Sequence, residues 1–271
     1  MPELPEVETT RRGIAPLLTG QTVRNVVVRD RRLRWPVPHK LRTALTGRTF
    51  IRIRRRAKYL LLHVNGACLI IHLGMSGSLR IIPTDTPPQK HDHLDIVLTN
   101  GHSLRFRDPR RFGSVHWTEQ APELHPLLAS LGPEPWDSAF NGNYLHQRAR
   151  GRTLAAKAYI MDARTVVGVG NIYASEALYG AGIHPARPAG RISRARYQSL
   201  RESIIEVLDA AIVAGGTTLR DFVASDGNPG YFFSCLKVYG RAGAPCRSCA
   251  NPIKKCVLGQ RSSFYCPKCQ R

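Results

Sequence analysis

Two pairs of cysteines near the C-terminus constrain this chain more than any other feature. Cys246 and Cys249 form one C-x-x-C pair, Cys266 and Cys269 form another, and sixteen residues separate them. Four thiolates at this spacing close a tetrahedral zinc site at the tips of two turns. The segment 237–271 is too short to build its own hydrophobic core, so the metal must hold it together. We expect a zinc finger over 237–271 with one structural Zn²⁺ and no ligand position left for water.

The other three cysteines do not fit this pattern. Cys256 lies between the pairs without a partner at metal-binding spacing, and Cys68 and Cys235 have apolar sequence neighbours. We expect all three to be packed thiols.

The first residues lack the apolar stretch of a signal peptide, and no apolar run approaches the roughly 18 residues of a membrane span. The sequence therefore predicts a cytoplasmic protein with no membrane partner.

The charge balance indicates a polyanionic partner. Forty Lys and Arg residues against nineteen Asp and Glu give a formal charge of +21, and the basic residues recur along most of the 271-residue chain. Such an excess neutralises backbone phosphates and gives salt-sensitive affinity for nucleic acid. Charge alone does not separate DNA from RNA, so a ribosomal or general RNA-binding protein stays open at this point.

Segments of β character fill the first half of the chain, mostly separated by Gly, Pro or Asn turns. They cover residues 22–29, 49–54, 58–64, 67–73, 94–99, 103–107 and 114–117. Their number and spacing favour an antiparallel sandwich or barrel-like sheet over alternating βαβ units. A turn-rich stretch at 131–136 ends this region, and we place a domain boundary there.

Helical periodicity marks the start of the chain and the region after that boundary. The first helix is expected over Pro5–Leu18, with an apolar face made of Val7, Ile14, Leu17 and Leu18. Further helices are expected over 143–150, 171–179 and 194–213. The last one carries a core-facing stripe, made of Tyr197, Leu200, Ile204, Val207, Leu208 and Ala211. The fold class is therefore α+β and multidomain.

The chain start, Met1-Pro-Glu-Leu-Pro-Glu, has a composition that structure alone does not demand, since termini usually carry solvated filler. If Met1 is removed, Pro2 exposes a secondary α-amine whose ordinary pKa, roughly 7.7–8.0, leaves a nucleophilic fraction at neutral pH. Its attack on a sugar C1′ yields a permanently charged iminium that can drive strand-cleaving elimination. Glu3 and Glu6 are placed to supply and accept protons.

A Gly-punctuated turn runs into a helix at Gly168-Val-Gly170-Asn171. Free amides at a helix N-terminus favour a phosphate, and the Asn171 side chain can add a donor. An ordinary loop with an Asn cap is the alternative. Inside the zinc hairpin, Arg261 lies in a turn that would present it outward, and its alternative is a plain solvated charge.

Several motifs together resemble formamidopyrimidine-DNA glycosylase. They are the start PELPEVE, then Arg56-Ala-Lys58-Tyr-Leu, His72-Leu-Gly-Met75-Ser-Gly, His91-Asp-His93, Asp108-Pro-Arg110-Arg111-Phe112-Gly, the GVGNIYASE run and the zinc hairpin with QRSSFYC. They occur in order and span nearly the whole chain. The resemblance implies an N-terminal helix and β-sandwich over 1–133, a helical helix-two-turn-helix domain over 134–230 and a zinc finger over 237–271. It also implies damaged double-stranded DNA as partner of a monomeric enzyme.

The resemblance implies catalytic roles at matching positions. Pro2 is expected to be the Schiff-base nucleophile and Glu3 the proton donor in glycosidic cleavage, with Glu6 helping to order the site. Lys58 is expected to act in β-elimination and Arg261 in δ-elimination, each also near a phosphate. A solvated basic stripe is the alternative for Lys58.

DNA contacts are implied in the same way. Asn171 is expected to hold the phosphate flanking the lesion, and His91, Arg110 and Arg152 to contact DNA. Arg152 lies in a locally divergent stretch.

Met75, Arg110 and Phe112 match the family's intercalating wedge, which fills the hole left by a flipped nucleotide. Core packing is the alternative for Met75 and Phe112, and an ion pair with Asp108 is the alternative for Arg110.

The expected activity is excision of oxidised purines followed by β,δ-elimination at the abasic site, with no cofactor beyond zinc. One rival is an endonuclease VIII-like glycosylase for oxidised pyrimidines, which shares fold and chemistry. Another is a non-catalytic zinc protein that binds nucleic acid, for which charge and cysteine spacing suffice. The resemblance places a loop over the flipped base at 215–230, whose sequence does not fix the pocket shape. Association with the nucleoid would follow from DNA binding.

Overall fold

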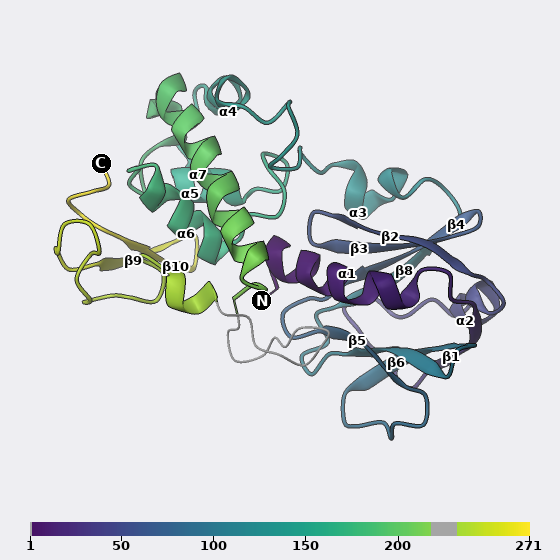
Figure 1. The fold of residues 1–271 in the computed structure, drawn as a ribbon. Coiled ribbons are helices and arrows are strands. Elements are labelled where there is room, and N and C mark those ends of the chain that lie inside the picture. The colour runs from purple at the N-terminus through teal and green to yellow at the C-terminus, as the bar shows by residue number, and fades with distance from the viewer. Residues whose placement is uncertain (1, 218–231) are drawn as a thin grey trace. The chain divides into compact units, whose positions relative to one another are not determined.

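The computed structural model describes residues 2–217 and 232–271 and is drawn in Figure 1. The chain divides into two compact units. The first contains residues 1–129 and 214–231, and the second contains residues 130–213 and 232–271. Most of the expected capping loop at 215–230 lies outside the described residues, which include only its first three positions.

The described residues of the first unit open with a helix and continue with eight strands and three short helical segments. The elements are α1 (Leu4–Leu18), β1 (Val23–Val28), α2 (Leu41–Leu45), β2 (Phe50–Arg56), β3 (Tyr59–Val64), β4 (Ala67–His72), β5 (Ser78–Pro83), β6 (Asp92–Leu98), β7 (His102–Arg107), β8 (Ser114–Thr118), η1 (Pro122–Leu124) and α3 (Pro126–Ala129). All strand pairs are antiparallel, in the orders β1-β6-β7-β5 and β2-β3-β4-β8. The expected antiparallel sandwich is confirmed.

The core of this unit lies between the inner faces of the two sheets and extends to α1. Leu62 and Leu69 of one sheet and Leu104 and Phe106 of the other belong to one cluster of buried side chains. Helix α1 adds Val7, Ile14 and Leu18, because these positions recur at helical spacing on one face. The helix contacts β2, β3 and β5 and is thereby fixed against the sandwich.

Two details of this unit differ from expectation. Leu17 is 55% exposed, because a step of one residue turns it about 100° away from the buried Leu18. Strand β5 was not expected. Its sequence, Ser-Leu-Arg-Ile-Ile-Pro, has two adjacent apolar residues and a closing proline, which obscure the alternation typical of a half-buried strand.

The second unit is mostly helical. It contains α4 (Gly142–Ala149), α5 (Ala156–Met161), α6 (Asn171–Gly180), η2 (Ala189–Arg191), α7 (Arg194–Val213), η3 (Phe232–Cys235), β9 (Lys254–Leu258) and β10 (Arg261–Tyr265). Helix α7 has the expected bounds, and every residue of its predicted stripe is buried except Val207, which is half-buried. The strands β9 and β10 form an antiparallel hairpin. No helix in the described part of the chain is long and apolar enough to cross a membrane.

Candidate functional site

The start of helix α1 holds the predicted nucleophile and proton donor. Pro2 is buried, and Glu3, the N-cap residue of the helix, is 2% exposed. The Glu6 Oε2 atom accepts a hydrogen bond from the Glu3 backbone N–H at 2.8 Å. This bond fixes the direction in which the first residues leave the helix. The two residues that follow Met1 are therefore held by the fold, unlike an ordinary terminus.

Glu6 also connects the chain start to the segment that follows α7. Its Oε1 atom accepts a hydrogen bond from the Thr217 backbone N–H at 2.7 Å. Gly216 has a φ of +84°, and a Cβ there would lie 3.0 Å from Glu6 Oε1. Glu6 is 2% exposed and uses both oxygens in these bonds. It therefore orders two segments of the same unit, in line with its expected role.

Lys58 occupies the second position of the two-residue turn between β2 and β3. Arg56 and Tyr59 pair across the turn, and Ala57 in its first position has a φ of +54°. Non-glycine residues rarely adopt this left-handed conformation, so contacts with the surrounding structure must hold Ala57 in it. Arg55 Nη1 donates to the Ala57 carbonyl at 2.9 Å. The position of Lys58 is therefore set by an anchored turn and not by a free strand edge.

His72, at the end of β4, lies close enough to Lys58 to respond to its charge. Burial lowers the pKa of His72 to about 4, with a further contribution from the Lys58 ammonium. The ring is therefore neutral at pH 7, and its Nδ1 accepts a hydrogen bond from the Gly74 N–H at 3.0 Å. His72 thus fixes the backbone just before Met75.

Met75 and Phe112, the predicted wedge residues, lie on two loops that pack against each other. A Cβ on Gly74 would lie 2.4 Å from both the Phe112 carbonyl carbon and the Gly113 nitrogen, so only glycine allows this approach. Phe112 is 43% exposed and Met75 is half-buried. Neither side chain belongs to the core cluster of this unit, so the core-packing alternative is wrong.

Arg110 is exposed, with its guanidinium carbon 5.2 Å from the centre of the Phe112 ring. In the described part of the chain the Arg110 guanidinium forms no ion pair with Asp108, so that alternative is wrong. The Asp108 carboxylate is 0% exposed and accepts bonds from the Ser76 hydroxyl at 2.8 Å and the Gly113 N–H at 2.7 Å. Asp108 therefore holds the loop while the Arg110 side chain stays outside.

His91 closes the loop before β6 and has a φ of +75°. Its backbone carbonyl accepts from the Asp108 N–H at 3.1 Å, so it lies beside the same loop. Partial desolvation and the neighbouring charges, including Lys90, Arg107 and Arg111, lower the pKa of His91. The surroundings of this ring are thus strongly cationic.

In the second unit, Asn171 is the first residue of α6 and follows the N-cap Gly170. Its Nδ2 donates to the Tyr239 hydroxyl at 3.3 Å, while its Oδ1 is buried with no hydrogen-bond partner in the described chain. Gly168 has a φ of +83°, which the Gly-Val-Gly turn requires. Asn171 is therefore not the cap of its helix, and that alternative is wrong.

Sequence reasoning gave no role to Glu176, which is 3% exposed on the same helix. Its carboxylate accepts three backbone N–H groups, from Lys237 at 2.7 Å, Val238 at 2.9 Å and Tyr239 at 2.7 Å. The arrangement attaches the segment leading to the zinc module onto α6. A glutamate in a helix whose other residues are all uncharged was the available signal, since a buried carboxylate needs partners.

Arg152 is exposed in the loop before α5, with its guanidinium carbon 5.8 Å from the Tyr159 ring centre. Its backbone also pairs with Gly190 at 2.9 Å, which keeps the loop in place. The residue is accessible for the expected DNA contact.

Arg261 is exposed at the start of β10, directly after a tight turn. Gly259 and Gln260 have φ values of +53° and +62°, as a two-residue type I′ hairpin turn requires. The buried Lys157 on α5 donates from Nζ to the Ser262 carbonyl at 3.0 Å and to the Ser263 hydroxyl at 2.9 Å. Sequence reasoning did not find Lys157, which anchors the strand that carries Arg261.

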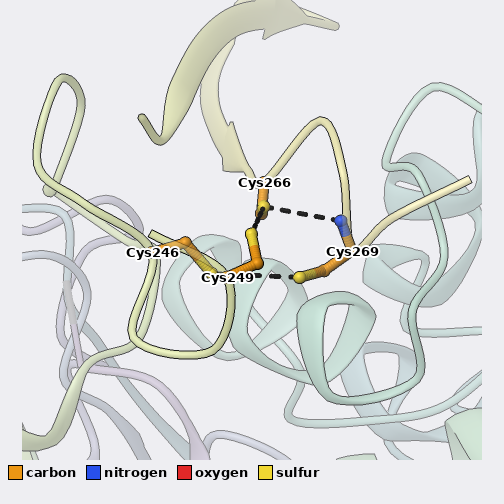
Figure 2. A group of neighbouring side chains, drawn as sticks. All are labelled: Cys246, Cys249, Cys266 and Cys269. Atoms are coloured by element: carbon orange, nitrogen blue, oxygen red, sulfur yellow. Dashed lines mark hydrogen bonds between the residues drawn. The ribbon is translucent and has the colours of Figure 1, made fainter. Parts of the chain in front are cut away.

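The four predicted zinc ligands come together, as Figure 2 shows. Their Sγ atoms all lie within 4.8 Å of one another, with 3.9 Å between Cys246 and Cys269 and 3.4 Å between Cys249 and Cys266. A tetrahedral zinc ion with Zn–S distances of about 2.3 Å requires sulfur separations of roughly 3.8 Å. The donor set and its size therefore fit one Zn²⁺, and four protein ligands leave no open coordination position.

Surrounding groups support these thiolates. The Asn251 Nδ2 and the Cys269 backbone N–H each donate to a ligand sulfur at 3.5 Å, as expected for outer-shell bonds.

Among the remaining cysteines, Cys68 is buried as expected and Cys256 is half-buried. Cys235 is exposed, so that prediction is wrong. Its short 3-10 helix turns only Phe232 inward.

Comparison with known proteins matches all parts of this architecture. Residues 1–115 match the formamidopyrimidine-DNA glycosylase N-terminal domain, residues 131–223 match its H2TH domain, and residues 243–271 match a zinc finger found in FPG and IleRS. The formamidopyrimidine-DNA glycosylases of Methylococcus capsulatus and Syntrophotalea carbinolica are each 62% identical to this chain, over the full length of both proteins.

Two solved structures extend the comparison to the fold. The MutM (Fpg) protein of Thermus thermophilus has a TM-score of 0.88 at 40% identity, covering 99% of this chain and 98% of that one. The Fpg (MutM) protein of Lactococcus lactis, in complex with a Fapy-dG containing DNA, has a TM-score of 0.90 at 33% identity, covering 99% of this chain and 100% of that one.

The fold and the site define a DNA repair glycosylase with a β-sandwich, a helical domain and a zinc finger. An identity of 62% over the whole length of both proteins marks these relatives as close homologues. The chain belongs to the formamidopyrimidine-DNA glycosylase family.

Proposed function

We infer that this protein excises oxidised purines, such as 8-oxoguanine and formamidopyrimidines, from duplex DNA and then cleaves the strand at the abasic site. One observation carries the chemistry of this proposal: Pro2 and Glu3 are buried together at a helix start that the Glu6 carboxylate holds in place. Family membership supports the lesion class, since relatives with this name are identical at 62% of positions.

In the proposed first step, the Pro2 nitrogen attacks C1′ of the damaged nucleotide. A bond forms between this nitrogen and C1′, the bond from C1′ to the base breaks, and the base leaves with the electron pair and a proton. Glu3 supplies protons for this cleavage. The nitrogen then releases its one proton and the sugar ring opens: the C1′–O4′ bond breaks, O4′ takes up a proton, and the nitrogen lone pair forms a double bond to C1′. The product is a cationic iminium, because its nitrogen no longer carries a proton to lose. The step requires that Met1 be removed, since an amide nitrogen is not nucleophilic.

Strand cleavage follows from the acidity that the iminium confers on C2′. Loss of the C2′ proton expels the 3′ phosphate, and we assign Lys58 to this β-elimination. A second elimination expels the 5′ phosphate, and we assign Arg261 to it. Both residues are held by short turns, at Ala57 and at Gly259, which supports a positioned role for each.

DNA binding is assigned to the exposed residues of both units. We propose that Asn171 holds the phosphate flanking the lesion and that His91, Arg110 and Arg152 contact the backbone. Met75, Arg110 and Phe112 would fill the space of the flipped nucleotide, an apolar and planar set suited to that task.

The proposed domains are residues 1–133 for the catalytic β-sandwich, 134–230 for the helix-two-turn-helix domain and 237–271 for the zinc finger. One Zn²⁺ bound by the four clustered cysteines would stabilise the finger and keep Arg261 on its hairpin. Cytoplasmic action at the nucleoid follows from the proposed binding to chromosomal DNA.

Covalent trapping tests the proposed chemistry. Purified protein is mixed with a duplex carrying one 8-oxoguanine opposite cytosine, in sodium borohydride, and the adduct is resolved on a denaturing gel. A Pro2→Gly variant and a duplex with an oxidised pyrimidine run in parallel, and intact mass establishes loss of Met1. We expect an adduct on the purine duplex that weakens in the variant.

Other outcomes separate the rivals. Trapping only on the pyrimidine duplex would favour an endonuclease VIII-like specificity. No adduct on either duplex, from protein of the correct mass, would favour a zinc-containing protein that binds nucleic acid without catalysis.

A further inference from the structure

A pocket of about 130 Å³ lies on the face of the sheet β1-β6-β7-β5 that points away from the core. Strands β5 and β7 supply its walls, and the loop between β5 and β6 supplies its rim. Its lining is made of Ser78, Arg80, Ile82, Thr86, Pro87, Gln89, Asp92, Arg105 and Arg107. These residues are distinct from those proposed for catalysis and DNA contact, and all belong to the first unit.

The register of the sheet places two arginines side by side in this pocket. Arg80, on the edge strand β5, pairs directly with Arg105 of β7, and Arg105 pairs with Asp95 of β6. Like charges directly opposite each other destabilise a sheet. The arrangement therefore needs compensation on both sides of Arg105.

Arg105 is compensated within the fold. Its guanidinium forms two hydrogen bonds with Asp95, at 2.9 and 2.8 Å, and an ion pair with Asp92 at 3.3 Å. It also donates to the Thr86 carbonyl at 2.9 Å and the Pro87 carbonyl at 3.1 Å. Arg105 is saturated, and it fastens the rim of the pocket to the sheet in advance of any ligand.

Arg80 and Arg107 are not compensated by any carboxylate in the described part of the chain. The Arg80 Nε atom is buried and has no hydrogen-bond partner there. Arg107 Nη1 donates to Oε1 of Gln89, which is neutral. The acidic residue of the rim loop, Asp85, is exposed and does not line the pocket.

The local charge balance is therefore positive. Four guanidinium groups and two carboxylates meet at this face, which leaves an excess of two positive charges; the groups are Arg29, Arg80, Arg105, Arg107, Asp92 and Asp95. Two hydroxyl groups, of Ser78 and Thr86, also line the pocket. A tetrahedral oxyanion with several acceptor oxygens matches donors of these kinds, because guanidinium groups bind phosphate oxygens in pairs.

We propose that this pocket binds a phosphate group between Arg80 and Arg107. Its position indicates a backbone phosphate of the DNA duplex. Arg107 ends β7 three residues before Arg110, and Gln89 lies two residues before His91, so the pocket lies next to residues assigned to DNA contact. The DNA source rests on the proposed function, whereas phosphate binding itself does not. Free inorganic phosphate shares the chemistry and is separated from DNA by the test.

The salt dependence of binding tests the DNA source. Affinity for a duplex with an uncleavable abasic-site analogue is measured against salt for the wild type, Arg80→Gln, Arg80→Lys and the control Arg24→Gln. Arg24 is exposed on β1, at the opposite edge of the same sheet. Loss of one phosphate contact lowers the slope of log K against log salt by about 0.9 and weakens binding near 0.1 M salt roughly five- to tenfold.

We expect that loss for R80Q alone, with R80K and R24Q close to the wild type. Shortening the duplex one nucleotide at a time from each end locates the contact. Removal of the nucleotide whose phosphate occupies the pocket should weaken binding of the wild type and leave binding of R80Q unchanged. Unfolding temperature and zinc content must match among the variants. If R80Q folds poorly, Arg107→Gln, which removes the other guanidinium assigned to the phosphate, takes its place with the same expected loss.

A second arm uses inorganic phosphate without DNA. Nitrogen-15 NMR follows the arginine Nε–H signals, and the Arg80 signal, assigned by its absence in R80Q, should shift on titration with phosphate but not with chloride at equal ionic strength. A shift with unchanged DNA slopes would support a free-phosphate site. No shift and unchanged slopes would overturn the proposal. Failure of the wild type in borohydride trapping would overturn the proposed function and leave the phosphate titration to decide this site.

Discussion

Arg55 Nε donates a hydrogen bond to Glu8 Oε2 at 3.3 Å, joining two residues that lie 47 positions apart in the chain. Both side chains are largely buried, with 10% and 12% exposed. Because Arg55 also donates to the Ala57 carbonyl, it connects helix α1 to the turn that carries Lys58. The two parts of the first unit assigned to the nucleophile and to β-elimination are thereby held in a fixed relation.

Replacement of Arg55 should separate the two chemical steps. We expect Arg55→Ala to slow strand scission by between about tenfold and 100-fold, since small misplacements of a catalytic group have effects of this size, while base release falls less. Single-turnover assays that follow both products provide the measurement. The control is Arg12→Ala, which removes a 57% exposed partner of the same Glu8 and should change either rate by less than about twofold. Equal slowing of both steps would contradict a positioning role.

Glu8 should make the stability of the fold dependent on pH. Burial raises the pKa of its carboxyl. Hydrogen bonds from Arg11 and Arg12 and the charges of Arg11 and Arg55 lower the pKa by a larger amount, so it lies below the ordinary 4.5. A carboxyl whose pKa is lower in the folded state than in the unfolded state stabilises the fold at pH values above the unfolded-state pKa. This stabilisation is lost as the pH falls through the folded-state pKa.

The difference in unfolding free energy between the wild type and Glu8→Gln should therefore be complete near pH 7 and shrink below about pH 4.5. Urea titrations at a series of pH values measure it. The exposed Glu206 on α7 serves as control, because Glu206→Gln should give a small difference at every pH. A Glu8→Gln difference that grows on acidification would contradict the assigned sign.

How far the sequence could predict this protein depends on whether a signal is local. Helix α7 was found with its correct bounds because its apolar residues repeat over twenty positions. The zinc ligands were found because two C-x-x-C pairs have few other uses. Glu3 and Glu6 were found because both lie close to Pro2 in the sequence.

Features that depend on register or distant contacts were not found. The meeting of Arg80 and Arg105 follows from the pairing of β5 with β7, and β5 itself was missed. The role of Glu176 depends on backbone groups 61 to 63 residues away. No local pattern carries such information, since any strand face or helix face can meet several partners.

Glu176 should contribute strongly to the stability of the second unit. Glu176→Ala leaves three backbone N–H groups without their acceptor, and we expect the free energy of unfolding to fall by about 3 kcal/mol. Glu176→Gln keeps one carbonyl oxygen and should lose less. Urea unfolding measures the effect, together with zinc release, because Lys237–Tyr239 lead into the metal module. Glu206→Ala, an exposed change on α7, is the control, and a similar loss there would refute the assignment.

Gly74 and Gly101 allow steric overlap to be separated from backbone strain. Both have positive φ, +66° and +84°, but a Cβ on Gly74 would lie 2.4 Å from the Phe112 backbone, whereas nothing lies within 4 Å at Gly101. Gly101→Ala should cost only the strain of the left-handed conformation, about 1 kcal/mol. Gly74→Ala should cost about 3 kcal/mol or more, because the overlapping atoms belong to backbone that cannot rotate away.

The same substitution should also affect DNA binding. Separation of the two loops would displace Met75 from Phe112, so Gly74→Ala should weaken binding to lesion duplexes more than binding to undamaged DNA. Thermal unfolding and binding titrations on both duplexes measure these effects side by side with Gly101→Ala. Equal destabilisation by the two variants would mean that the loops separate freely, and the wedge would then not depend on their close packing.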